Sequence, residues 1–443
     1  MSATRNLELE ARHAASLEGP MGTLGDPGTR LLGGPAREEG AESRAAHLGR
    51  LGGLDLESAT PESLRQLVRA SGLEGRGGGQ FPLAAKLDLA AASGGTPLVV
   101  VNASEGEPAS RKDRTLLAHR PHLVIDGAMT AARAVGAREI VVYLHRARRR
   151  STAAMVEAIA QRDGDAAAIT VVDAPPRYVA GESSAVVGYL EGNGALPRRR
   201  AVPVAAHGVH GQPTVVSNAE TAAHLGLLAR RGAAWFREAG DAVSPGSTLV
   251  TLSGAVVRPG RVVEVSGPAT IGEALALYGG IAEVPRAVLV GGYEGTWIDG
   301  SVAMDAPLGR SALAACGTPL GCGLLAVMSP TCCGLRTTAR LVDWLAGESA
   351  GQCGPCVFGL PEVAALLDDL AEARAGRRDV RRLRALTASI AGRGACGHPT
   401  GVVGLVDSAL DTFASDLDRH ARGRECPYPA ARFELPGDAG ATT

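Results

Sequence analysis

The first half of the chain alternates short apolar runs with segments in which apolar residues recur every three or four positions. A short run rich in valine, isoleucine and leucine predicts a β-strand, and recurrence at helical spacing predicts a helix. In chain order we expect a helix at 61–70, a strand at 98–101, a helix at 122–135, a strand at 140–144, a helix at 152–161 and a strand at 169–172. Strands and helices in alternation favour a parallel sheet that is covered by helices.

The pattern changes twice further along the chain. After a linker with glycine and proline at 240–246, short β-type runs surround one expected helix, which predicts a small α+β unit of β-grasp size. From about Cys332, apolar residues return to helical spacing in three stretches, which predicts a helical bundle. These changes divide the chain into a partly ordered N-terminal extension (1–60), an α/β domain (61–238), a β-grasp domain (246–329), a bundle (331–425) and a flexible tail (426–443).

Length and composition exclude several classes of protein. A chain of 443 residues is too long for a single hydrophobic core. With 45 basic and 46 acidic residues the net charge is −1, so no overall field would attract nucleic acid. No apolar run of about 18 residues is present, so we expect neither a signal peptide nor a membrane span. The eight cysteines are expected to be reduced thiols, and the protein is expected to be cytoplasmic.

Two stretches suggest a site for a phosphorylated cofactor. The sequence Gly-Arg-Gly-Gly-Gly-Gln-Phe-Pro at 75–82 would let backbone N–H groups approach phosphate oxygens without obstruction by Cβ atoms. Glu105 and Glu107 directly follow a buried-type strand, at the end where open α/β sheets hold ligands. Each stretch alone fits an ordinary turn or solvated loop equally well, and Gln80 stands where a dinucleotide fingerprint would need glycine.

Three further segments complete the pattern. Residues 178–185 and 216–221 contain Gly181-Glu182-Ser183 and Ser217-Asn218, which alone would also fit capped helix starts. Residues 348–356 end in Cys353-Gly-Pro-Cys356 and are followed by a lone Cys396, which is typical of an iron–sulfur ligand run. Cys316, Cys322 and Cys426 sit in no ligand spacing and are expected to pack as small residues. The order of these segments along one chain is the informative signal.

From about Gly72 to Gly404 these motifs resemble the NADH-binding flavoprotein subunit of respiratory complex I and its relatives in NAD-linked hydrogenases and formate dehydrogenases. The resemblance implies an α/β multidomain fold: a Rossmann-like FMN domain, a β-grasp soluble-ligand-binding domain and a C-terminal four-helix bundle with one 4Fe-4S cluster. It implies an FMN-dependent NADH:acceptor oxidoreductase subunit with a quinone-type acceptor. Hydride would pass from NADH to FMN, and single electrons would leave through the cluster to a thioredoxin-like ferredoxin or another iron–sulfur subunit.

The resemblance also assigns residues to the sites. The implied cofactor-binding residues are Gly75, Arg76, Gly77, Gly78, Phe81, Lys86, Asn102, Ser104, Glu105, Gly181, Glu182, Ser183, Arg200, Ser217, Asn218 and Thr221. Glu107 and Glu182 would be the catalytic residues, and the Arg76 and Lys86 side chains would pair with phosphate. Two aromatic positions of the family are Leu87 and Pro203 here, so we expect weakened stacking on the dinucleotide.

The implied metal ligands are Cys353, Cys356 and Cys396, and Ala350 stands at the place of the fourth thiolate. Ser349, His398, a water or a three-iron cluster would make up for the missing ligand, and loss of the cluster is the alternative. Cys333 is too far away if one helix separates it from the site, because each helical residue adds about 1.5 Å. A non-catalytic subunit that keeps the family fold and docks partners is the second hypothesis for the function.

Overall fold

The computed structural model describes residues 21–26, 28–162, 167–199, 201–281, 283–424 and 426–428. Its first unit is built on a four-stranded parallel sheet in the order β4-β3-β2-β5. The strands are β2 (Leu98–Ala103), β3 (Glu139–Leu144), β4 (Ala168–Asp173) and β5 (Thr214–Asn218). The helices are α3 (Pro61–Ser71), α4 (Leu83–Ala92), α5 (Lys112–His119), α6 (Pro121–Val135), α7 (Arg149–Ala160), α8 (Ser183–Leu190) and α9 (Ala219–Arg237). The expected parallel sheet with helices is therefore confirmed.

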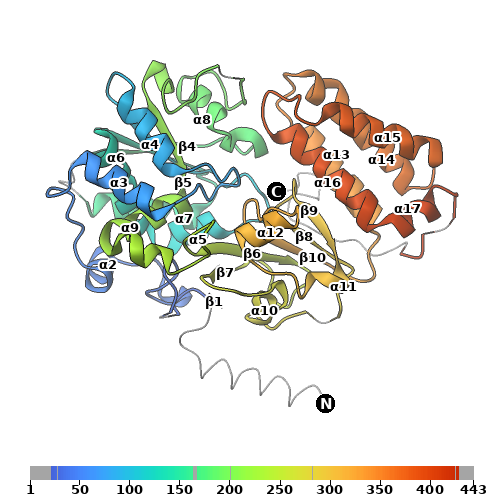
Figure 1. The fold of residues 1–443 in the computed structure, drawn as a ribbon, viewed down its shortest axis with the longest axis horizontal. Helices are drawn as coiled ribbons and strands as arrows, with labels where there is room; N and C mark the ends of the chain where they lie inside the picture. The colour runs from blue at the N-terminus through green and yellow to red at the C-terminus, as the bar shows by residue number, and fades with distance from the viewer. Residues whose placement is uncertain are drawn as a thin grey trace, which may run out of the picture.

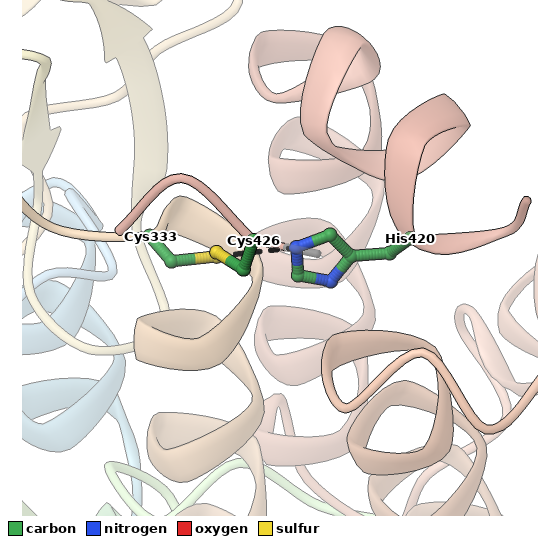
Figure 2. A group of neighbouring side chains, drawn as sticks. All are labelled: Cys333, His420 and Cys426. Carbon is green, nitrogen blue, oxygen red and sulfur yellow. Dashed lines mark hydrogen bonds between the residues drawn. The ribbon is translucent and has the colours of Figure 1, made fainter. Parts of the chain in front are cut away.

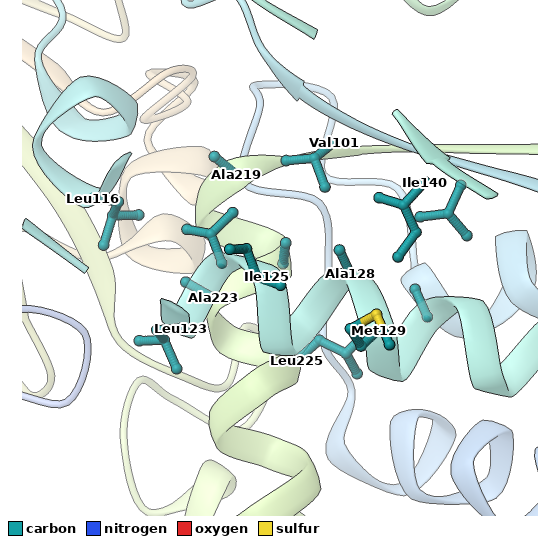
Figure 3. Packing of buried hydrophobic residues seen from close by; sticks show 14 of the residues in the cluster. Val101, Leu116, Leu123, Ile125, Ala128, Met129, Ile140, Ala219, Ala223 and Leu225 are labelled. Atoms are coloured by element: carbon teal, nitrogen blue, oxygen red, sulfur yellow. The ribbon is translucent and has the colours of Figure 1, made fainter. Parts of the chain in front are cut away.

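Apolar side chains cover both faces of this sheet. Val99, Val101, Ile140 and Val142 belong to the main core under α6 and α9, and Figure 3 shows this packing. On the other face, Val100 and Tyr143 pack with Val186 and Val187 of α8. Strands buried on both faces explain why the sequence shows continuous apolar runs instead of alternation.

Helices α6 and α9 cross in very close contact because each has a glycine there. A Cβ atom on Gly127 would lie 1.6 Å from the carbonyl oxygen of Ala222, and one on Gly226 would lie 2.8 Å from that of Leu123. No side chain fits between backbones at these distances. The two glycines therefore set the spacing of the helices that support β2 and β5.

The part of the N-terminal extension that the structure describes is packed against both sheets. It contains β1 (Met21–Gly22), η1 (Arg37–Glu39) and α2 (Arg44–Leu51). Leu31 and Leu32 are fully buried in the main core. Their backbone N–H groups donate to the Glu264 carboxylate at 2.8–3.0 Å, and the buried Arg120 donates to the carbonyl of Leu32 at 2.8 Å. The segment thus joins the first sheet to the second.

The second unit is a mixed six-stranded sheet in the order β1-β7-β6-β10-β8-β9. Strands β6 and β10 are parallel, and the other neighbours are antiparallel. Its elements are β6 (Thr248–Gly254), β7 (Arg261–Val265), α10 (Ile271–Ala276), β8 (Ala287–Val290), β9 (Thr296–Asp299), α11 (Gly300–Ala303), α12 (Arg310–Ala315) and β10 (Leu324–Met328). The sequence pattern predicted β6, β7, β8 and α10 but not β1, β9 or β10.

The third unit is helical, as expected. It contains α13 (Gly334–Gly347), η4 (Pro355–Gly359), α14 (Leu360–Ala371), α15 (Arg377–Ile390), α16 (His398–Thr412) and α17 (Ala414–His420). Figure 1 shows this bundle, in orange and red, beside the mixed sheet and on the side away from α3 and α4. Trp297 of β9 meets Phe413 edge-on with ring centroids 5.4 Å apart, which joins the bundle to the sheet. No helix in the described ranges is long and apolar enough to cross a membrane.

Candidate functional site

The candidate cofactor site lies where the strand order of the parallel sheet reverses. The chain runs from β2 outward to β3 and β4, and then returns to place β5 on the other side of β2. The carboxyl ends of β2 and β5 therefore form a topological switch point, which is where open α/β sheets hold ligands. Asn102 and Asn218 are paired in register at this edge, so two of the predicted residues lie side by side.

The glycine-rich loop lies against the start of α9. The Arg76 backbone N–H donates to Thr221 Oγ1 at 2.8 Å, and a Cβ atom on Gly77 would lie 3.3 Å from the Asn218 Cβ. Gly78 has a φ of +104°, which favours glycine, and Gln80 is held at +47°. The side chain of Gln80 leaves a buried Nε2 with no partner among the described residues. The loop thus forms a backbone-lined cradle over the N-terminus of a helix, the arrangement that favours phosphate.

The two remaining loops close on each other beside this cradle. Asn102 Nδ2 donates to the Gly181 carbonyl at 2.6 Å, and Ser104 Oγ donates to Asn102 Oδ1 at 2.8 Å. A Cβ atom on Gly106 would lie 2.5 Å from the carbonyl oxygen of Tyr178, and one on Gly181 would lie 2.8 Å from Ser104 Oγ. The structure therefore brings together the motifs at 75–82, 102–108, 178–185 and 216–221.

Glu105 has an internal role in this structure. Its carboxylate accepts hydrogen bonds from the backbone N–H groups of Asp113 and Arg114 at the start of α5, and from Arg114 Nε at 2.8 Å. Burial acts to raise the pKa of Glu105, but the ion pair with Arg114 and the nearby Lys112 hold it below its usual value. The side chain caps a helix, so its expected cofactor contact stays a prediction without support from the geometry.

Glu107 is the most perturbed carboxyl group of the site. Its Oε2 accepts a hydrogen bond from the Tyr293 backbone N–H at 2.9 Å, and its Oε1 is buried without a hydrogen-bond partner in the described chain. Burial raises the pKa of Glu107 to about 8, and the charge of Glu294 adds to the effect. The group is therefore protonated at neutral pH and carries a proton that it can donate.

The two basic side chains expected at a phosphate have other partners. The Arg76 guanidinium is fully buried and donates to the Pro245 carbonyl at 2.6 Å, which ties the glycine loop to the second unit. Burial lowers the pKa of Arg76 to about 10. Lys86 Nζ lies 3.2 Å from the Val216 carbonyl and 5.7 Å from the centroid of the Phe81 ring. The Arg76 Nε and Nη1 atoms are buried without a hydrogen-bond partner in the described chain, so the pairing of Arg76 with phosphate stays a prediction.

A buried ionic network under the cradle was missed by the sequence reasoning. Lys112 Nζ lies 2.7 Å from Asp113 Oδ1, 3.1 Å from Glu220 Oε2 and 3.0 Å from Asn218 Oδ1. Asn218 Nδ2 donates to Asp113 Oδ2 at 2.6 Å. Burial opposes the charge of Lys112, but the two carboxylates raise its pKa. The sequence Lys112-Asp113 shows only a charged helix start, because the partner Glu220 comes from a segment more than a hundred residues later.

The other predicted cofactor residues differ in their surroundings. Glu182 caps α8 by accepting hydrogen bonds from Ser184 and from the Ala185 N–H, while Ser183 and Ser217 are half-buried at the same edge. Phe81 is 52% exposed, which suits a stacking platform. Leu87 is fully buried in the main core, and the weakened stacking expected from leucine at this position stays a prediction. Arg200 lies outside the described residues.

The predicted cluster ligands come from the loop after α13 and from the segment before α16. Cys356 is buried, and Cys353 and Cys396 are half-buried. Burial acts to raise the pKa of Cys353, but hydrogen bonds from the backbone and from the Cys356 thiol lower it. Burial raises the pKa of Cys356 to about 12, and the nearby Cys353 and Cys396 raise it further. The three thiols therefore share one environment.

His398 is not a free substitute for the missing thiolate. Its Nδ1 lies 2.5 Å from Glu294 Oε1, and its Nε2 lies 3.0 Å from the Leu345 carbonyl. Both ring nitrogens are thus engaged, and the proposal that His398 replaces the thiolate at Ala350 is not supported.

The cysteine loop also touches the cofactor loops, because the Tyr178 backbone N–H donates to Glu348 Oε2 at 2.9 Å.

A parallel sheet with a glycine cradle at its switch point, in contact with a cysteine-bearing helical unit, defines a redox protein of the flavin and iron–sulfur class. The family model of the Nuo51 FMN-binding domain matches residues 68–226, and that of the NADH-ubiquinone oxidoreductase-F iron-sulfur binding region matches residues 336–420. The chain belongs to the family of F-type subunits of NADH-quinone oxidoreductase.

Individual relatives agree with this assignment. The chain is 32% identical to the F-type NADH-quinone oxidoreductase subunit of Streptomyces coelicolor over 84% of this chain and 86% of the relative. It is 28% identical to NADP-reducing hydrogenase subunit HndC of Solidesulfovibrio fructosivorans over 83% of this chain and 78% of the relative. A chain of the H2-reduced NAD+-reducing [NiFe]-hydrogenase is similar with a TM-score of 0.75 and 27% identity over 82% of this chain. The match spans 66% of that solved chain.

Proposed function

We propose that this chain is an FMN-dependent electron-input subunit that oxidises NADH and passes single electrons through an iron–sulfur cluster to a partner iron–sulfur protein. The observation that carries the proposal is the convergence of the glycine loop, Asn102 and Asn218 at the switch point of the parallel sheet. We place this activity in the cytoplasm, on the cysteine usage, with a quinone-type terminal acceptor and a thioredoxin-like ferredoxin as the partner class.

The residues present fit FMN. A side chain at Gly77 would fill the space beside Asn218, and Gly75 and Gly78 leave the rest of the loop backbone accessible. Asn102, Gly181, Ser217 and Thr221 surround the same edge. When bound, FMN would supply the conversion between two-electron and one-electron transfer. The protein would hold the phosphate with backbone N–H groups and the polar ring edge with amide and hydroxyl groups.

The residues on the dinucleotide side supply a ring surface and a proton donor. Phe81 exposes half of its side chain at the mouth of the cradle and would stack on NADH. Glu107 is a protonated carboxyl group at neutral pH, so it would orient an amide or hydroxyl of the substrate by donating a hydrogen bond. Glu182 keeps the η2 loop (Tyr178–Gly181) in place by capping α8.

The cysteine loop fits a cluster held by three thiolates. Cys353, Cys356 and Cys396 would be the ligands, and Ala350 offers no thiolate as a fourth. Because Tyr178 bonds to Glu348 and its ring lies 5.6 Å from that of Trp344, the cofactor loops and the cluster loop form one continuous contact. This contact would connect the flavin site to the cluster site, from which the partner would take electrons.

Gly77→Leu tests the proposal. The full-length chain is purified, reconstituted with FMN and assayed for flavin per chain and for NADH-dependent reduction of an artificial acceptor. We expect wild type to hold close to one FMN per chain. The variant should hold at least about tenfold less, because the leucine side chain enters the cradle. Gly53→Leu is the matched control, since Gly53 has no atom within 4 Å of its Cβ position. A wild-type protein that binds no FMN after reconstitution would refute the proposal and favour the non-catalytic subunit.

A further inference from the structure

Two cysteines and a histidine from separate segments converge at one end of the bundle. Cys333 precedes α13, His420 is the last residue of α17, and Cys426 lies in the segment after it, as Figure 2 shows. The three ligand atoms lie within 4.8 Å of one another, and all three residues are buried. Cys333 Sγ and His420 Nε2 are 3.9 Å apart. No spacing in the sequence pointed to this group, although Cys426 packs in the bundle core as expected.

The histidine ring is already oriented for a ligand. Its Nδ1 lies 3.2 Å from the Leu370 carbonyl oxygen, which can only accept a hydrogen bond. The proton of the neutral ring therefore sits on Nδ1, and Nε2 turns its lone pair toward the two sulfur atoms. A carbonyl that fixes the tautomer of a histidine in this way is the usual outer partner of a metal-bound imidazole.

The two sulfur atoms lie on the same side of the histidine. Cys333 is the N-cap residue of α13, and Cys426 belongs to the segment that follows α17. Both residues are buried together with His420. The group thus combines a nitrogen lone pair with two buried sulfur atoms.

We propose that Cys333, His420 and Cys426 bind a zinc ion, with the fourth tetrahedral position open to a further oxygen ligand. Zinc takes sulfur at about 2.3 Å and nitrogen at about 2.0 Å, so ligand atoms in a tetrahedral site lie about 3.5–3.8 Å apart. The observed 3.9 Å between sulfur and nitrogen is close to this spacing. Binding releases one proton from each thiol and transfers no electron.

This site is distinct from the predicted cluster site. Cys333 and Ala350 lie at opposite ends of α13, which has 14 residues and is therefore about 20 Å long. The zinc ion would instead tie the C-terminal segment to the bundle and the mixed sheet. Tyr428 stacks on Arg286 at 4.3 Å, and Arg286 pairs with Asp416 of α17 at 2.5 Å. The proposed ion therefore holds the C-terminal segment where the bundle meets the mixed sheet.

Metal analysis of the full-length chain tests the inference. The protein is expressed with zinc supplementation, its affinity tag is removed, and zinc is measured per chain by mass spectrometry. We expect about one zinc in wild type and a loss of at least about fivefold in Cys426→Ser and His420→Ala. Cys316→Ser is the control, because Cys316 is exposed and outside the group. Cys426 follows the last helix of the bundle. A loss of zinc in Cys426→Ser would therefore not be explained by misfolding of the bundle.

Cobalt substitution gives a second readout. Wild-type protein loaded with Co2+ should show thiolate-to-cobalt charge transfer and the visible bands of a tetrahedral ion, and Cys426→Ser should lose both. The triple variant Cys353→Ser, Cys356→Ser, Cys396→Ser should keep them, which separates this site from the cluster site. Wild type without zinc, equal zinc in Cys426→Ser, or a Cys333–Cys426 disulfide found by peptide mapping would each overturn the proposal.

Discussion

Replacement of Glu107 by glutamine should remove the contribution of this buried carboxyl group to the pH dependence of stability. The folded protein raises the pKa of this carboxyl group from the usual 4.5 to about 8, mainly by burial. Below the lower value the group is neutral in both states and contributes no dependence on pH. Between the two values only the unfolded chain is ionised, so the free energy of unfolding falls as pH rises. Above about pH 8 both states are ionised and the loss is complete.

The magnitude follows from the same two values. Each pH unit of the interval costs about 1.36 kcal/mol, which gives an upper bound of about 5 kcal/mol. Glutamine keeps the shape and a hydrogen-bonding oxygen but never ionises. From about pH 5 to pH 8 the free energy of unfolding of wild type should therefore fall by a few kcal/mol relative to that of Glu107→Gln. Above about pH 8 the difference between the two proteins should stay level.

Urea unfolding at matched flavin content, from about pH 5 to pH 9, measures this difference. Glu57→Gln serves as the control, because Glu57 is exposed. Since only the difference between two proteins is used, other titrating groups cancel. A difference that does not change with pH would show that Glu107 is ionised in the folded protein, and the argument from its burial would fail.

Three further substitutions have directions set by the structure. Ala350→Cys should raise iron toward about four atoms per chain after anaerobic reconstitution and slow bleaching in air, measured by iron and sulfide analysis with EPR; unchanged iron would show that another group already fills the position. Gly127→Ala should lower the free energy of unfolding, measured in urea, by about 1–3 kcal/mol or more. Gly49→Ala, whose Cβ position is open, should not destabilise the protein. Lys112→Met should destabilise by about 3–5 kcal/mol, because two buried carboxylates lose their cation; an unchanged melting temperature would contradict this.

Local patterns predicted the elements that bury apolar faces. The runs around Val99 and Ile140 and the spacing of α6 are visible in the sequence because each element repeats one residue type at a fixed period. Helix α15 was not predicted, because it is rich in arginine and buries only Leu383, Thr387 and Ile390. Strands β9 and β10 are short and follow turns, so their pairing depends on partners that are distant in the chain.

The position of the site was predictable, but the partners of its side chains were not. The resemblance assigned Asn102 and Asn218 to one cofactor site, and the structure pairs them in register at one edge of the sheet. The same sequence does not show that Glu105 caps a helix or that Arg76 turns toward Pro245, because these contacts depend on how separate units pack. The group of Cys333, His420 and Cys426 was not predicted for the same reason, since the partners of Cys333 lie 87 and more residues away in the sequence.

The contacts of the N-terminal segment constrain the order in which the molecule is completed during synthesis. Met21 pairs with Val265, and the N–H groups of Leu31 and Leu32 are satisfied by Glu264, more than 230 residues later. This segment is synthesised long before β7, and its contacts with Glu264 and Val265 cannot form until β7 has emerged. Pairings of such long sequence separation form late, since the loop between them must close first. The docking of this segment is therefore completed late in folding, and the N–H groups of Leu31 and Leu32 lack their Glu264 partner until then.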